Sequence, residues 1–106
     1  MPTAKVLEVI DGKSLMIAPK WEHNNKSGFI LILDGVSTPA RDEKGGLEAK
    51  EAHTKICQGK NISFTGDKID LHRRLVAEIE INNVSVNETM RELGYKSYKA
   101  MYFTPS

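Results

Sequence analysis

The stretch Val6-Leu7-Glu8-Val9-Ile10-Asp11-Gly12-Lys13-Ser14-Leu15 places two β-rich runs around an Asp-Gly pair. Valine, isoleucine and leucine fit the pleated surface of a sheet, and Asp-Gly is a common connection between antiparallel strands. We therefore predict a β-hairpin that turns at Asp11-Gly12. Lys13 follows the turn directly, so a positive charge is expected at one end of this hairpin.

Three strands are expected in the first third of the chain. Thr3 to Ile10 and Ser14 to Ala18 form the hairpin, and Pro19 is expected to stop the second strand because proline lacks a backbone N–H. Trp21 to Gly28 is polar and rich in asparagine, which predicts an exposed loop. Phe29 to Leu33 is continuously apolar, which predicts a strand buried on both faces.

Helices and strands alternate in the rest of the chain. Apolar residues at helical spacing and turn residues at the ends predict a helix over Leu47 to Gln58, strands over Asn61 to Thr65 and Leu75 to Ile81, and a helix with Val86, Met90 and Leu93 on one face. Five strands suffice to close a small barrel. The chain is thus predicted to be one mainly β, α+β domain over residues 1–106, with a flexible tail from about residue 100.

Composition restricts the possible partners and location. The 106 residues carry a net charge of +1, so no global field attracts nucleic acid and any such site must be a local patch. The single cysteine, Cys57, cannot form an internal disulfide and is interpreted as a packing residue. Neither a leader nor an apolar span is visible, and we therefore predict a cytoplasmic protein without a membrane segment.

The order of these features resembles the staphylococcal nuclease family. The likeness runs from about Ala4 to about Tyr98. Besides the opening hairpin, it is carried by Ser37-Thr38-Pro39, Gly46-Leu47-Glu48-Ala49, Gly59-Lys60, Asp70 to Ala77, Val86-Asn87-Glu88 and Gly94-Tyr95. Each motif is weak alone, but their order and spacing make the resemblance fairly specific. It implies a five-stranded oligonucleotide-binding (OB-fold) barrel with two helices, the first of which covers the open end of the barrel.

The resemblance also implies a chemistry that this chain has lost. The family hydrolyses phosphodiesters with calcium held by two carboxylates, a glutamate that activates water, and two arginines that stabilise the transition state. At these positions the chain has Lys13 and Ser37 in place of the carboxylates, Ala40 in place of the base and Ile32 in place of one arginine. The other arginine is retained as Arg74.

Each replacement removes a different part of the reaction. Ala40 cannot accept a proton, and Ser37 cannot supply negative charge to a hard cation. A lysine at position 13, about 4 Å from a divalent cation, would be repelled by about 8 kcal/mol at an effective dielectric constant of about 20. We therefore predict a catalytically inactive domain that uses no metal and no cofactor.

Several side chains remain that could bind a nucleic acid. Lys13, Arg41, Arg73 and Arg74 are candidates for phosphate contacts. Tyr95 and Tyr98 are candidates for base stacking, although packing against the barrel is the preferred interpretation of both tyrosines. Beside the arginines, His72 is interpreted as part of a solvated turn.

Three functions are compatible with these observations. The favoured one is an inactive nuclease-like module that binds single-stranded DNA or RNA, or a protein partner. A second is a calcium- or magnesium-dependent nuclease whose site has moved to Asp34, Asp42 and Glu43, although we interpret these as loop residues in contact with solvent. A third is a protein-interaction domain without nucleic-acid affinity, which the near-neutral charge allows. His53 is interpreted as a surface or partly buried helix residue.

Overall fold

Eight elements make up the part of the chain that the structure, a computed structural model, describes, which is residues 1–96. In chain order they are β1 (Thr3–Val9), β2 (Ser14–His23), β3 (Lys26–Leu33), α1 (Gly46–Cys57), β4 (Asn61–Ile69), β5 (Leu75–Ile81), β6 (Val84–Ser85) and α2 (Val86–Glu92). Tyr98 and the rest of the tail lie outside the described residues. Among residues 1–96, neither helix has the length and apolar character that a membrane span requires.

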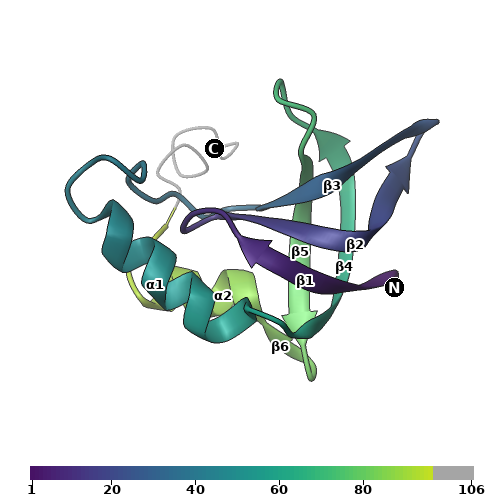
Figure 1. The fold of residues 1–106 in the computed structure, drawn as a ribbon. Helices are drawn as coiled ribbons and strands as arrows, with labels where there is room; N and C mark the ends of the chain where they lie inside the picture. Colours follow the sequence, from purple (N-terminus) through teal and green to yellow (C-terminus); the bar gives the residue numbers. More distant parts are fainter. Residues whose placement is uncertain (97–106) are drawn as a thin grey trace, which may run out of the picture.

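The first five strands close into a barrel. They follow one another in the antiparallel order β3-β2-β1-β4-β5, and a parallel pairing between β3 and β5 joins the two ends. This closing seam pairs Leu31–Leu33 with Leu75–Ala77. The short strand β6 pairs antiparallel with the end of β5, and α1 and α2 lie together at one side of the barrel (Figure 1). The predicted mainly β fold, a small OB-like barrel with two helices, is thus confirmed.

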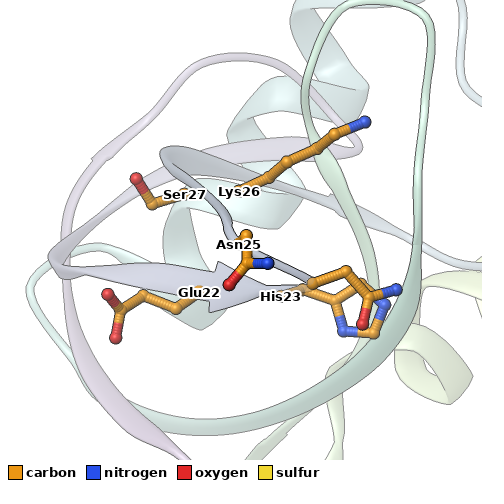
Figure 2. A pocket seen from close by; sticks show the side chains of 6 residues that line it. Glu22, His23, Asn25, Lys26 and Ser27 are labelled. Carbon is orange, nitrogen blue, oxygen red and sulfur yellow. The ribbon is translucent and has the colours of Figure 1, made fainter.

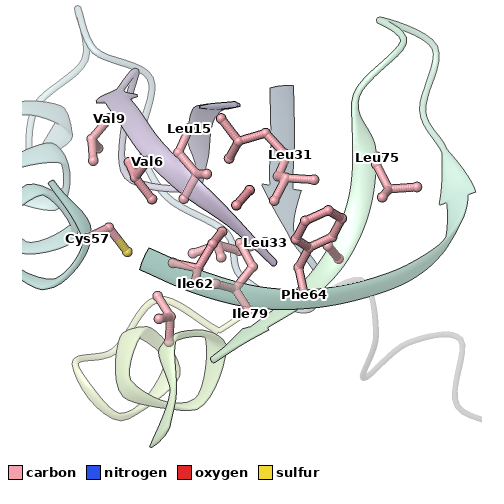
Figure 3. Close-up of a cluster of buried hydrophobic side chains, with 14 of the residues drawn as sticks. Val6, Val9, Leu15, Leu31, Leu33, Cys57, Ile62, Phe64, Leu75 and Ile79 are labelled. Carbon is pink, nitrogen blue, oxygen red and sulfur yellow. The ribbon is translucent and has the colours of Figure 1, made fainter. Parts of the chain in front are cut away.

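Alternate residues of the strands fill the barrel. Leu15, Ile17, Leu31 and Ile79 are fully buried, and apolar side chains from all five barrel strands converge in one cluster (Figure 3). Cys57 joins this cluster from α1, and burial raises the pKa of its thiol to about 12. The interpretation of Cys57 as a packing residue is therefore confirmed.

The prediction that Pro19 ends the second strand and that Trp21 begins an exposed loop is wrong. β2 continues through both residues to His23, and only Asn24 and Asn25 separate it from β3. Pro19 lies where the register of the β2–β3 pairing shifts, so its missing N–H does not break a regular ladder. Trp21 is buried because its ring lies against Gly28 of β3.

Two expectations about apolar faces also need correction. The strand from Phe29 to Leu33 is not buried on both faces: Leu31 and Leu33 are buried, whereas Phe29 is 53% exposed. The strand lies in the wall of a barrel, so alternate side chains face outward. On α2, Val86 and Met90 are buried as predicted, but Leu93, the C-cap residue, is exposed.

Candidate functional site

The connection between β1 and β2 is organised by one carboxylate. Oδ1 of Asp11 accepts hydrogen bonds from the backbone N–H groups of Lys13 and Ser14, both at 2.9 Å. The N–H of Ile10 donates to the carbonyl of Ser14 at 3.0 Å and closes the connection. Asp11 therefore has a structural role, and it fixes the backbone on which Lys13 is carried.

Gly12 is required for a reason other than the one that the Asp-Gly motif suggests. Its φ angle is not in the left-handed region that glycine favours in tight hairpin turns. A Cβ atom at this position would instead lie 2.8 Å from Cβ of Ala49 in α1 and 2.8 Å from Cγ2 of Thr38. The turn was placed correctly by the motif, but close packing against a helix and a loop is what excludes a side chain here.

His53 links α1 to the same turn, and the sequence-based interpretation of it as a surface or partly buried residue is wrong. The side chain is fully buried, and Nδ1 lies 2.8 Å from the carbonyl oxygen of Asp11. Because a carbonyl only accepts, Nδ1 carries the proton of a neutral ring. Burial lowers the pKa of His53, and this effect outweighs the hydrogen bond and the negative charge of Asp11, which raise it.

Arg74 is held in place from two directions. Its Nε donates to Oδ2 of Asp70 at 2.7 Å, and its Nη1 donates to Oγ of Ser14 at 3.3 Å. Partial burial raises the pKa of Asp70, but hydrogen bonds from Arg74 and from the His72 backbone, with the arginine charge, lower it overall. Within residues 1–96 the side-chain hydrogen bonds of Arg74 use Nε and Nη1, so Nη2 is left for a ligand.

Strand pairing brings three of the predicted positions to one place. Ile32 pairs with Ser14 on one side and with Val76 on the other, and the N–H of Leu33 donates to the carbonyl of Lys13 at 2.8 Å. The Arg74 bond to Ser14 completes the cluster. We define the turn surface as Lys13, Ser14, Ile32 and Arg74. It combines two cations with an aliphatic side chain, a set that suits an anion with an apolar part, and the buried Ser14 hydroxyl holds Arg74 in place.

Ser37 and Ala40 belong to the loop between β3 and α1. The N–H of Ser37 donates to the carbonyl of Tyr95 at 3.1 Å, and the N–H of Ala40 donates to Oε1 of Glu43 at 2.8 Å. Thr38, between them, approaches Gly12, so the loop passes beside the turn. No hydrogen bond within residues 1–96 joins the side chain of Ser37 or any part of Ala40 to the turn surface.

The remaining candidates for nucleic-acid contacts are not part of the turn surface. Arg73, with φ +60°, is exposed in the turn that precedes Arg74. Arg41 lines a separate hollow together with acidic residues of its own loop and of α1. Tyr95 is half-buried and packs against the core, as the preferred interpretation holds, whereas Tyr98 lies outside the described residues.

A displaced metal site at Asp34, Asp42 and Glu43 has no support in the described residues. Asp34 lines one hollow with Asp67 and Glu78, whereas Asp42 and Glu43 line another. Within residues 1–96, no group of three or more histidine, cysteine, aspartate or glutamate side chains is arranged to hold a metal ion. The loop carboxylates therefore do not converge on one point.

A further hollow lies at the β2–β3 hairpin. Glu22, His23, Asn25, Lys26 and Ser27 line it, and Figure 2 shows the Glu22 carboxylate and the His23 ring directed away from each other. These groups do not face a common ligand position. The turn surface remains the place where the predicted residues are brought together with fixed geometry.

Asn87 is a buried residue whose role the sequence pattern did not reveal. Its Oδ1 accepts from the N–H of Ile79 at 2.9 Å, and its Nδ2 donates to the carbonyls of Asp34 and Ala77, both at 2.9 Å. The side chain thereby joins the end of β3 to β5. An asparagine on the apolar face of a short helix, one residue after Val86, was the available signal.

Comparison of the chain with protein-family models and with curated proteins gave no match.

Proposed function

We propose that this chain is a catalytically inactive barrel of the staphylococcal nuclease type that binds single-stranded nucleic acid without cleaving it. In this proposal the turn surface receives the phosphate backbone. Lys13 supplies a mobile charge, and Arg74 supplies a guanidinium group whose orientation is already set. Phosphate contacts of this kind provide most of the affinity of sequence-independent nucleic-acid binding.

The observation that carries the proposal is the fixed position of Arg74 against Ser14, the residue that follows Lys13 in the chain. Asp70 and Ser14 orient the guanidinium group, so little conformational entropy is lost when it meets a phosphate. Lys13 forms no salt bridge within residues 1–96, and its backbone is held by Asp11 and Leu33. Both cations are therefore positioned by the protein and accessible to a ligand.

The lack of catalysis in the proposal follows from the chemistry of the same residues. Hydrolysis of a phosphodiester needs a group that activates water and groups that stabilise the transition-state charge; Ala40 cannot accept a proton, and Ile32 carries no charge. Two cations at the turn surface also oppose the binding of a divalent metal ion there. Retained binding with lost hydrolysis is the function that these side chains support best.

Fluorescence anisotropy with a labelled oligothymidylate tests the proposal. The change Lys13→Ala leaves the backbone contacts of the turn intact, and we expect it to weaken binding about three- to tenfold. The slope of log K against log salt concentration should fall by about 0.7, the value for one phosphate contact on a single strand. The matched control is Lys26→Ala, which removes an exposed lysine from the β2–β3 hairpin and should leave affinity and slope unchanged.

Three results would contradict the proposal. The first is a wild-type protein that fails to bind the oligonucleotide at low salt, which would favour the protein-interaction function. The second is cleavage of the oligonucleotide in the presence of calcium or magnesium that a chelator abolishes. The third is an equal loss of affinity in Lys13→Ala and Lys26→Ala, which would place binding elsewhere on the surface.

A further inference from the structure

We infer that His53 is a positioning residue for the turn surface and makes nucleic-acid binding there sensitive to acid. The inference rests on the proposed function, because it assigns a control to the same site. His53 does not touch the turn surface itself. It acts through the backbone of Asp11, which precedes Gly12 and Lys13 in the connection between β1 and β2.

The geometry allows His53 to hold the turn only as a neutral ring. Nδ1 donates its proton to the carbonyl of Asp11 at 2.8 Å, and Nε2 is buried without a hydrogen-bond partner within residues 1–96. Protonation would add an N–H group at Nε2, which has no hydrogen-bond partner in the packed arrangement, and would place a charge on a fully buried side chain. The protonated ring is therefore incompatible with the packed arrangement.

The charged groups near His53 do not remove this conflict. The Asp11 carboxylate faces it from the turn and favours the protonated form, but burial has the larger effect and the pKa of His53 is lowered. Lys13 follows in the turn and Lys50 lies three residues before His53 on α1, and neither supplies a negative charge that would favour the protonated ring. Thr38, which packs against the turn from the loop, is uncharged.

Release of the ring would loosen the segment that carries Lys13. Gly12 is packed directly between Ala49 of α1 and Thr38, so a shift of α1 relative to the turn changes the surroundings of Gly12. The backbone that carries Lys13 next to Ser14 would lose its fixed position. Affinity for phosphate would therefore fall as the pH falls through the pKa of His53, which burial places below the ordinary value for histidine.

Two variants distinguish the effect of the His53–Asp11 hydrogen bond from the effect of protonating the His53 ring. His53→Asn keeps an N–H donor at a position similar to Nδ1 but cannot be protonated in this pH range. His53→Phe keeps an aromatic ring in the core and removes the donor. Both variants retain His23 and His72, so all three proteins share every other histidine.

The first measurement follows backbone amide NMR signals from about pH 7.5 to about pH 4.5. In the wild type, the Gly12 and Lys13 signals should shift together with the His53 ring, whereas in His53→Asn they should not respond. The Ile79 amide, held by Asn87, reports global unfolding and should remain native over the same range. If the Gly12 and Lys13 signals stay constant while the ring titrates, or change only together with Ile79, the inference is overturned.

The second measurement is binding of oligothymidylate, whose bases do not titrate in this range. At about pH 7.5 the wild type and His53→Asn should bind within about twofold, and at about pH 5 the wild type should bind at least about fivefold more weakly than the variant, a difference of about 1 kcal/mol. Identical pH profiles would overturn the inference. Absence of binding at every pH, with the NMR response intact, would reject the proposed function and support the coupling of His53 to the turn.

Should neither variant fold, the wild-type titration still decides the matter, since it compares the ring, turn and Ile79 signals within one protein. His53→Phe, where it folds, should show displaced Gly12 and Lys13 signals already at about pH 7.5. Signals that match those of the wild type at neutral pH would show that the hydrogen bond does not position the turn.

Discussion

The β1–β2 and β2–β3 connections are both short, but they are stabilised in different ways. Asn24 and Asn25 have φ angles of 50° and 64°, a conformation that asparagine tolerates and that forms a hairpin turn by itself. The connection at Asp11-Gly12 instead depends on an aspartate side chain, a histidine from α1 and close packing by Thr38. The conformation of the Asp11-Gly12 connection can therefore respond to changes in those distant residues. The Asn24-Asn25 turn does not depend on distant residues and cannot respond in this way.

The largest effect is expected where the β2–β3 hairpin joins the barrel. Trp21 is 2% exposed, and its Nε1–H donates to the carbonyl of Ile30 at 2.9 Å. Trp21→Ala should lower the free energy of unfolding by about 3–5 kcal/mol, which urea denaturation would measure. Trp21→Phe should cost less because it retains most of the ring. A small loss of unfolding free energy in Trp21→Ala would mean that the whole β2–β3 hairpin contributes little to the stability of the fold, and not just its tip.

The next effect tests the packing of the first turn. Gly12→Ala places a Cβ atom 2.8 Å from carbon atoms of Ala49 and Thr38, so α1 or the loop must move. We expect a loss of about 1–3 kcal/mol in the free energy of unfolding, together with weaker oligonucleotide binding. Unchanged stability in urea would show that α1 and the turn are not tightly packed.

Removal of the Asp11 carboxylate tests the capping of the same turn. Asp11→Ala leaves the N–H groups of Lys13 and Ser14 without their acceptor and should cost about 1–2 kcal/mol. Asp11→Asn retains an oxygen at Oδ1 and should cost less, so thermal unfolding of the two variants separates the hydrogen bonds from the charge. Equal losses in both variants would assign the effect to charge.

Asp70 stabilises the first turn indirectly, through Arg74 and Ser14. Its pKa is lowered in the folded protein, so its stabilising contribution is present above the unfolded pKa of about 3.8 and is lost as the pH falls through the folded value. Asp70→Asn should therefore cost about 0.5–1 kcal/mol at neutral pH and progressively less below about pH 3.8. If the ion pair does not contribute, urea denaturation would give the same difference in free energy of unfolding between the wild type and Asp70→Asn at every pH in this range.

The smallest effect is expected at the tip of the β2–β3 hairpin. Asn25→Gly substitutes another residue that adopts positive φ, in an exposed turn, and should change the free energy of unfolding by less than about 0.5 kcal/mol. Oligonucleotide binding should be unchanged. A substantial loss in either measurement would remove the distinction between the two turns.

Local patterns predicted the barrel better than they predicted the contacts that position the site. Burial of Trp21 depends on Gly28 across the sheet, and local polarity does not reveal that pairing. His53 offered a better signal, since it lies four residues after Ala49 and three before Ile56, on the apolar stripe of α1. Its polarity led to its interpretation as a surface or partly buried residue. The partner that makes a buried histidine acceptable, the Asp11 carbonyl, lies 42 residues away in the sequence.

The amide of Asn87 has a consequence for the order in which the barrel can assemble. It supplies hydrogen bonds to Asp34, Ala77 and Ile79 where the parallel pairing of β3 and β5 ends, so a residue of the last helix completes a junction between two earlier strands. A nascent chain that has left the ribosome only as far as Ile81 contains every barrel strand but still lacks the hydrogen bonds that Asn87 supplies. Stable closure of the cylinder should therefore await synthesis of α2.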